Sequence, residues 1–346
     1  MDEVFLKDYI NSYSPSGSEM NSQQLWFDYI KHLSDSVIVE NQGNVIAEIN
    51  RPMRPQILME AHVDEVAYRI SVISENGMIY VIKNGNPDHQ VAPSSRVVIH
   101  TDRGLVDGVF GWPAIHTRET TITPTIDNLF IDCGIGSRKE LEKLGVKIGC
   151  LVTYPSNFKI LGNYYTGKGL DNKIGGYILS QVMSRIKGVA NEYDMLFANT
   201  VQEEVGLRGS NMICQTFKPK LAIVIDVTSD SSTPMMNKKR SGDISCGRGP
   251  IIVFSAATNV KFVNLIEKIA INNKIRYQRK ALGKSTLTNA DNYTTHGIMT
   301  ALISIPLRYM HTEVEMVHAR DVEDSINLIY SVLKDLKEDY DFSFLT

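Results

Sequence analysis

The stretch Thr200-Val-Gln-Glu-Glu-Val-Gly-Leu-Arg-Gly209 places two adjacent carboxylates directly after a largely apolar run, residues 193–198. Two glycines then interrupt the regular backbone, so this pattern predicts a strand followed by Glu203, Glu204 and a turn. In an open α/β sheet, ligands bind beyond the carboxyl ends of the strands. The stretch therefore predicts an α/β protein with an acidic site at that edge of its sheet.

Other carboxylates and histidines stand at or just beyond the ends of apolar, strand-like runs. They are His62 with Asp64, Asp171, Asp226 and His311. Taken alone, each has a structural explanation. Asp171 stands where the N-cap of a helix over 172–186 is expected, and a single histidine is more often structural than a ligand. Together, these strand ends predict one shared site at the edge of the sheet.

The composition of this set suits two divalent cations. Imidazole and carboxylate groups bind zinc, cobalt or manganese without any thiolate, and Asp171 can bridge two ions as in two-metal hydrolases. Asp64 lies two residues after His62, so on an extended segment both side chains point the same way and Asp64 can orient the imidazole. Glu203, beside the ligand Glu204, is then free to act as a general base toward water.

The chain of 346 residues is longer than a typical single core, so two domains are expected. Helical periodicity and apolar runs over 1–66 and 160–346 predict a mixed-sheet α/β domain that carries the site. Between them, 67–159 contains short alternating runs separated by turn residues. This pattern predicts an inserted all-β domain, a barrel or a sandwich.

Composition excludes several classes of protein. Hydrophobic residues make up 43% of the chain and charged residues 22%, as in ordinary globular proteins. The net charge of -3 and the absence of a basic stripe argue against nucleic-acid binding. The four scattered cysteines predict free thiols, and neither a secretory signal nor a membrane span is expected. These features predict a cytoplasmic protein.

Five motifs occur in a fixed order along the chain: Ala61-His-Val-Asp-Glu65, Gly167-Lys-Gly-Leu-Asp-Asn-Lys173, Gln202-Glu-Glu-Val-Gly-Leu-Arg-Gly209, Asp226-Val-Thr228 and Arg308-Tyr-Met-His311. In this order they resemble metallopeptidase family 42, the dinuclear metal aminopeptidases. That family includes glutamyl and deblocking aminopeptidases and relatives labelled cellulase M. The resemblance extends over nearly the whole chain, including the β insertion.

The resemblance implies a role for each residue of the set. The metal ligands would be His62, Asp171 as the bridge, Glu204, Asp226 and His311, with Glu203 as general base and Asp64 orienting the histidine. It implies two divalent ions per subunit, with zinc expected and cobalt or manganese as alternatives. It also implies hydrolysis of N-terminal residues from peptides. It also implies a homo-oligomer such as a tetrahedral dodecamer, with the β domain contributing to assembly and substrate access.

The chain departs from the family pattern near the site at Asn172-Lys173, Ala290-Asp291-Asn292 and Thr312-Glu313. Because no departure replaces a ligand, we expect them to affect substrate preference and assembly. Lys238, Lys239, Arg240 and Arg248 either favour an acidic substrate or form a solvated basic loop.

Three alternatives remain open from the sequence. The first is a dinuclear deacylase of acylated amino acids, which would keep every ligand. The second is a glycosidase that uses Glu203 and Glu204, whose carboxylates would have to face one substrate about 5–9.5 Å apart. The third is a non-catalytic metal-binding scaffold, which would need no base beside its ligands.

Overall fold

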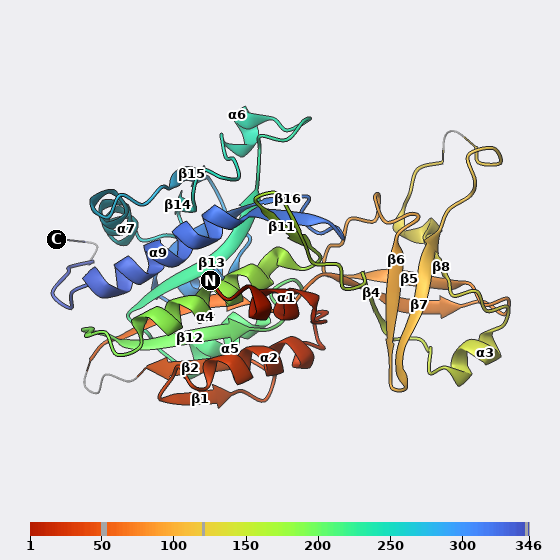
Figure 1. Cartoon of the computed structure of the whole chain (residues 1–346), viewed down its shortest axis with the longest axis horizontal. Helices are drawn as coiled ribbons and strands as arrows, with labels where there is room; N and C mark the ends of the chain where they lie inside the picture. The colour runs from red at the N-terminus through yellow and green to blue at the C-terminus, as the bar shows by residue number, and fades with distance from the viewer. Residues whose placement is uncertain (50–53, 120–121, 343–344, 346) are drawn as a thin grey trace.

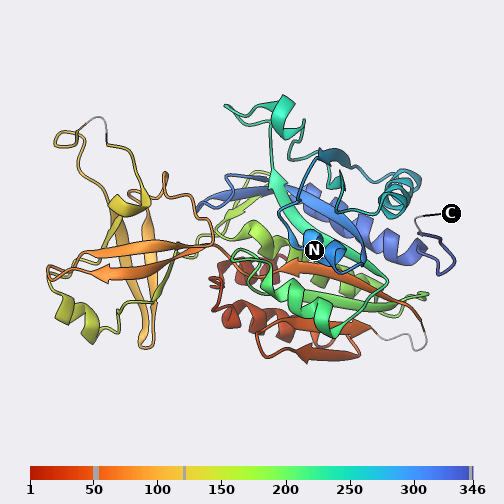
Figure 2. The ribbon, with the colours of Figure 1, turned by 180° about the vertical axis from the view of Figure 1, so that it is seen from behind.

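The computed structural model describes residues 1–49, 54–119, 122–342 and 345. It confirms the predicted fold class, a mixed α/β sheet with its helices and a separate closed antiparallel barrel (Figure 1). The view from behind shows that the barrel projects from one end of the sheet (Figure 2). No helix in the described part of the chain has the length and apolar character needed to cross a membrane.

The main sheet runs in the order β1-β2-β12-β3-β13-β16-β17-β11-β10, and β14 and β15 join it through β16. Its strands are β1 (Ser36–Val39), β2 (Val45–Ile49), β3 (Gln56–His62), β10 (Lys159–Leu161), β11 (Tyr164–Gly167), β12 (Asp194–Thr200), β13 (Leu221–Ser229), β14 (Ile251–Ser255), β15 (Gln278–Leu282), β16 (Met299–Arg308) and β17 (Glu315–His318).

Strand direction brings five strand ends to one edge of this sheet. Strands β12, β3, β13 and β16 are parallel neighbours. Strand β11 runs the same way, because two antiparallel pairings through β17 separate it from β16. The carboxyl ends of all five strands therefore point in one direction, as the sequence predicted.

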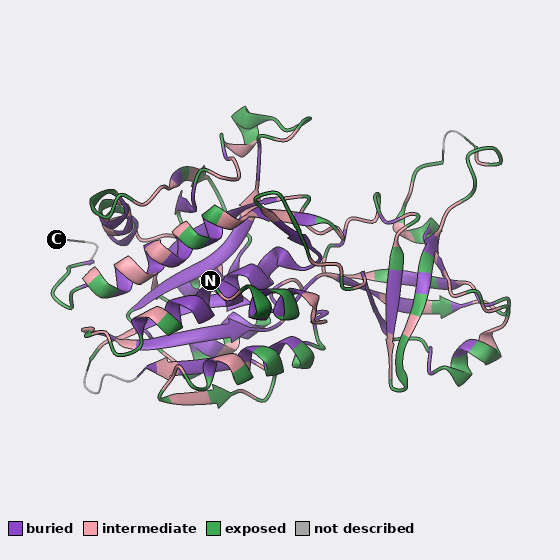
Figure 3. Ribbon diagram, in the orientation of Figure 1, coloured by how far each residue is buried: buried purple, intermediate pink, exposed green. Residues whose placement is uncertain are grey.

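Helices cover both faces of the sheet. They are α1 (Glu3–Asn11), α2 (Met20–Ile30), α4 (Leu170–Ile186), α5 (Arg208–Thr216), α6 (Lys238–Ser241), α7 (Val260–Asn272), α8 (Asn289–Thr295) and α9 (Ala319–Asp335). Helices α4 and α9 pack together on one face, and α5 and α8 pack together on the other. The central strands between these layers are almost entirely buried (Figure 3).

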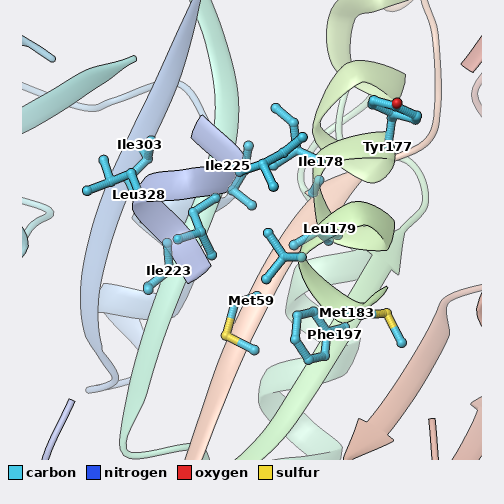
Figure 4. Packing of buried hydrophobic residues seen from close by; sticks show 14 of the residues in the cluster. Met59, Tyr177, Ile178, Leu179, Met183, Phe197, Ile223, Ile225, Ile303 and Leu328 are labelled. Atoms are coloured by element: carbon cyan, nitrogen blue, oxygen red, sulfur yellow. The ribbon is translucent and has the colours of Figure 1, made fainter. Parts of the chain in front are cut away.

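Alternation along each buried strand divides the core into two layers. On β13, Ile223 and Ile225 pack toward α4, where Ile178 and Leu179 meet them (Figure 4). The residue between them, Val224, belongs to the layer on the α5 and α8 face. His62 and Asp226 share the alternation of that second layer, so the sheet directs both side chains to the same face.

The barrel has the strand order β4-β5-β8-β7-β6-β9 and its own hydrophobic core. Its elements are β4 (Ala67–Ile73), β5 (Ile79–Asn84), β6 (Arg96–Thr101), β7 (Gly104–Gly111), η1 (Ile126–Asn128), β8 (Phe130–Asp132), α3 (Arg138–Lys143) and β9 (Leu151–Thr153). Tyr68, Ile99, Phe110, Ile131 and Val152 fill its interior. Closure pairs the strand edges, which removes the unpaired backbone groups of an open sheet.

Candidate metal centre

The structure brings all the predicted site residues together at the carboxyl edge of the main sheet. His62 ends β3, Glu203 and Glu204 follow β12, and His311 follows β16. Asp226 lies within β13, which continues to Ser229, so the prediction that this aspartate ends its strand is wrong. The strand continues because it pairs with β16 as far as Ser229.

Asp171 lies between the two histidines. Its Oδ1 is 3.3 Å from Nε2 of His62, and its Oδ2 is 3.3 Å from Nε2 of His311. The interpretation of Asp171 as an N-cap is wrong, because Gly169 holds the cap position of α4 and both carboxylate oxygens of Asp171 face imidazoles. The Asp171–Asn172 peptide bond is cis.

The other carboxylates complete the cluster around these imidazoles. Glu204 Oε1 lies 3.2 Å from Nε2 of His311. Asp226 Oδ1 and Glu203 Oε2 lie 3.8 Å and 3.9 Å from Nε2 of His62. Glu203 thus has a longer contact with its histidine than Glu204 has.

Both imidazoles have their Nδ1 atom engaged outside the cluster. Nδ1 of His62 lies 3.1 Å from the carbonyl oxygen of Asp64 and 3.4 Å from its carboxylate. Nδ1 of His311 lies 2.9 Å from the carbonyl oxygen of Asn86, next to the barrel. Because these neighbours only accept hydrogen bonds, each Nδ1 carries a proton, and Nε2 is the atom that faces the carboxylates and would bind a cation.

Asp64 connects His62 to the segment that carries the two glutamates. Its buried carboxylate accepts hydrogen bonds from the backbone N–H groups of Glu203, at 2.9 Å, and Glu204, at 3.2 Å. The hydroxyl of Ser16 donates a further hydrogen bond at 2.6 Å. Asp64 therefore contacts both the imidazole and the backbone of the glutamate loop, and its role in orienting His62 stays a prediction.

Glu315 is a positioning residue that the sequence patterns did not reveal. One oxygen of its buried carboxylate accepts the backbone N–H of His311 at 2.7 Å, and the other accepts that of Asp171 at 3.0 Å. Burial raises the pKa of Glu315 to about 8, although these N–H groups oppose the rise. In the sequence, the one indication of this role is that Glu315 is an acidic residue at the start of β17, four positions after His311.

The electrostatics of the cluster are those of crowded, buried anions. Burial, followed by the charges of Asp226 and Glu204, raises the pKa of Glu203 to about 10. Burial also raises the pKa of Asp226 and of Glu204. Asp171 differs, because hydrogen bonds from both histidines outweigh burial and lower its pKa.

The donor set fits divalent cations. In the described part of the chain, no lysine or arginine nitrogen lies within 4.0 Å of these four carboxylates, and the ion-pair contacts that they make are with His62 and His311. Two overlapping groups have ligand atoms within 4.8 Å of one another: His62, Asp171 and Glu204, and His62, Glu203 and Asp226. Buried carboxylates need a positive partner, and oxygen with imidazole nitrogen suits zinc, cobalt or manganese.

The cluster forms one part of a cavity of about 340 Å³. Other walls come from Thr228 and Ser229 on β13, from β14 to β16, and from the loop before α8. Lys280 on β15 supplies the one lysine of the lining within the described residues. Lys238, Lys239, Arg240 and Arg248 do not line this cavity, and Asp243 pairs with Lys238 at 2.6 Å and Arg248 at 3.6 Å. The solvated-loop interpretation of these residues is the one that fits.

Two of the three segments that differ from the family pattern make structural contacts next to the site. Nδ2 of Asn172 donates to the carbonyl oxygen of Ile225, and the buried Lys173 donates to that of Ser12 at 2.7 Å. Asp291 accepts hydrogen bonds from the backbone N–H groups of Thr286 and Leu287, which line the cavity. The third departure lies in the turn after His311, where Thr312 donates to the carbonyl of Tyr309.

A family model described as M42 glutamyl aminopeptidase matches residues 43–328. The chain belongs to this family. The M42 chain is 28% identical over 345 residues to a lysyl aminopeptidase of Pyrococcus furiosus, with coverage of 97% of this chain and 98% of the relative.

Solved structures of TET peptidases share the architecture of both parts of the chain. The TET aminopeptidase of the marine sediment archaeon Thaumarchaeota archaeon SCGC AB-539-E09 superimposes with a TM-score of 0.91, at 28% identity and 96% coverage of each chain. The TET1 peptidase of Pyrococcus horikoshii has a TM-score of 0.85 at 28% identity, with coverage of 96% and 99%. That peptidase is described as assembling into a tetrahedron or a large octahedral shell.

Membership of the M42 family establishes the class of activity of this chain. The chain is a hydrolase of the aminopeptidase type, which agrees with the resemblance found in its motifs. Membership of a metallopeptidase family also implies divalent metal ions, which agrees with the acidic and histidine cluster. Two similar solved structures carry the glycosidase alternative in their names, an endoglucanase of Thermotoga maritima at 27% identity and a putative peptidase/endoglucanase at 29%, each with a TM-score of 0.78. The family model and the lysyl aminopeptidase relative favour the peptidase.

Proposed function

We propose that this chain removes N-terminal residues from peptides with a dinuclear metal site and Glu203 as general base. The observation that carries the proposal is the position of Asp171, 3.3 Å from both His62 and His311. A carboxylate that faces two imidazoles through separate oxygens is placed to bridge two cations.

The surrounding residues divide into two proposed ligand sets that share Asp171. His62 and Asp226 would hold one ion, and Glu204 and His311 would hold the other. The contact of 3.2 Å between Glu204 and His311 supports the second set. When bound, the ions would act as Lewis acids on the scissile carbonyl and lower the pKa of water.

Glu203 is the remaining carboxylate, and we assign it the proton transfers. One of its oxygens takes a proton from water as the water oxygen attacks the carbonyl carbon. The same carboxyl group then returns the proton to the nitrogen of the leaving peptide as the carbon–nitrogen bond breaks. Asp64 supports this role because it holds the backbone N–H groups of both glutamates.

The proposal extends to assembly and to the barrel. We propose that the chain forms a homo-oligomer through surfaces that include the barrel, and that 67–159 act as a separate domain of the cytoplasmic enzyme. Exposed apolar side chains on the barrel strands, including Val72, Ile82 and Leu105, support an interface there. The contact of His311 with Asn86, at the base of the barrel, supports a role in access to the site. A monomeric mass in solution would exclude this assembly.

The activity is tested with a panel of aminoacyl anilides and short peptides on protein of known metal content. We expect hydrolysis of unblocked substrates, loss of activity with a chelator, and recovery with zinc, cobalt or manganese. N-acetylated amino acids are the matched control, since a deacylase would cleave these and leave the free N-terminus intact. Absence of hydrolysis across the panel by metal-loaded protein would exclude the proposal.

A further inference from the structure

A second cavity lies between α2 and the hairpin of β1 and β2, at one edge of the main sheet (Figure 1). Its volume is about 580 Å³, which is within the usual range of small-molecule sites. It shares no lining residue with the cavity at the metal cluster. A molecule bound in this cavity would therefore be additional to any substrate at the cluster.

One face of α2 forms the first wall of this cavity. Four of its lining residues are spaced at intervals of three and four, so they lie on the same side of the helix. They are Met20, Gln23, Gln24 and Phe27. The ring of Phe27 is half-buried, whereas Met20 is 77% exposed at the rim. The helix thus presents an aromatic ring and a thioether to the cavity.

The hairpin supplies the second wall. Val39 of β1 and Val45 of β2 are paired directly across the hairpin, and both line the cavity. Val45 is buried and Val39 is 57% exposed, so apolar surface extends from the interior to the rim. Val201, which follows β12, adds a further buried apolar side chain. The two walls together suit the apolar body of a ligand.

Glu19 places a buried carboxylate in the same cavity. The residue is 5% exposed, and its Oε1 accepts the backbone N–H of Gly17 at 2.6 Å. Burial, followed by the charge of Asp64, raises the pKa of Glu19 to about 7, although backbone N–H groups oppose the rise. In the part of the chain that the structure describes, no lysine or arginine nitrogen lies within 4.0 Å of this carboxylate. A buried anion without a cation favours a ligand that supplies one.

The other polar groups of the lining do not supply that cation. The charged residues that line the cavity, within the described ranges, are Glu19 and Glu40. Oε2 of Glu40 accepts a hydrogen bond from Nδ2 of Asn44 at 2.6 Å. The exposed amides of Gln24 and Gln42 add neutral donors and acceptors at the rim. The cavity is therefore complementary in charge to an ammonium group and repels a carboxylate.

We propose that this cavity is a second ligand site, which binds a small primary amine with an apolar body. The ammonium group donates hydrogen bonds to Glu19, and the body lies between Phe27 of α2 and the two valines of the hairpin. Glu19 also accepts a backbone hydrogen bond from Gln202, so the ligand lies next to the segment that carries Glu203. The inference does not rest on the proposed function, because the metal cluster takes no part in this site.

The probe that tests the site is para-bromobenzylamine, whose bromine can be located by anomalous diffraction. In soaked crystals of the zinc-loaded protein, we expect a bromine peak beside Phe27 and Val45, with the amine nitrogen within hydrogen-bond distance of Glu19. The matched probe para-bromobenzoate has a similar shape but the opposite charge, and it should leave this cavity empty. A bromine peak confined to the metal cluster, or equal occupancy of the cavity by both probes, would overturn the proposal.

Calorimetry in solution separates a true site from binding at crystal concentration only. Glu19→Gln removes the charge at nearly constant size and should weaken binding of para-bromobenzylamine on the order of 10-fold. Val39→Trp should block the rim from an exposed position, so its effect does not depend on a change in the core. Ile38→Trp is the matched control, because side chains alternate along β1 and Ile38 does not line the cavity.

Two results in solution would contradict the site. Wild-type affinity in both Glu19→Gln and Val39→Trp would show that the amine binds elsewhere. Loss of binding on removal of zinc would place the amine at the metal cluster. We expect instead that zinc-free and zinc-loaded protein bind the probe equally, and that Ile38→Trp retains the wild-type affinity.

Discussion

Replacing Glu203 with glutamine is expected to lower kcat for peptide hydrolysis on the order of a hundredfold to ten-thousandfold, with metal content retained. Glutamine keeps the size of the side chain but cannot take a proton from water at its amide oxygen near neutral pH. The backbone hydrogen bond from residue 203 to Asp64 is unaffected by this change. Steady-state rates on a preferred anilide, together with elemental analysis of the same sample, measure both quantities.

The matched control for this prediction is Glu204→Gln, which alters the neighbouring carboxylate. Because Glu204 contacts His311 at 3.2 Å and is a proposed ligand, its replacement should weaken binding of one ion as well as activity. If Glu203→Gln lost metal and Glu204→Gln kept it, the two roles would be exchanged.

Replacing Asp171 with asparagine is expected to remove the common ligand of both ions and with it nearly all activity. The neutral amide offers one acceptor oxygen where the carboxylate presents separate oxygens to His62 and His311. The loss should also appear in stability. Zinc should raise the unfolding temperature of the wild type, because it binds only the folded state, and have little effect on the variant.

An exposed aspartate of the barrel provides the comparison for Asp171. Asp107→Asn makes the same chemical change on β7, away from the cluster, and should keep both the activity and the thermal shift with zinc. A full zinc-dependent shift in Asp171→Asn would contradict the bridging role.

Much of this fold could be predicted from the sequence because its strands are buried and end in unusual residues. The apolar run before Asp226 and the alternating runs of the insertion identified strands of the sheet and of the barrel. The gathering of His62, Asp171, the two glutamates and His311 followed from one rule, that parallel strands share an edge. The rule holds here because β11 is parallel to β16 through β17.

What the sequence did not reveal depends on contacts between distant segments. Glu315 fixes two backbone N–H groups, and Asn86 reaches His311 across 225 positions. Lys280 faces the cavity only because a short, half-exposed strand pairs with β14. Such residues have no periodic pattern, since their roles come from tertiary pairing. At Asp171, local sequence alone favours a helix cap, whereas the fold places its carboxylate between His62 and His311.

We assign metal binding to Glu204 and proton transfer to Glu203. Anomalous diffraction from zinc-loaded crystals tests this assignment most directly. We predict two peaks about 3.5–4 Å apart, both contacting Asp171, with His62 and Asp226 at one and Glu204 and His311 at the other. Glu203 should contact neither peak directly. A single peak, or a peak coordinated by Glu203 in place of Glu204, would contradict the account.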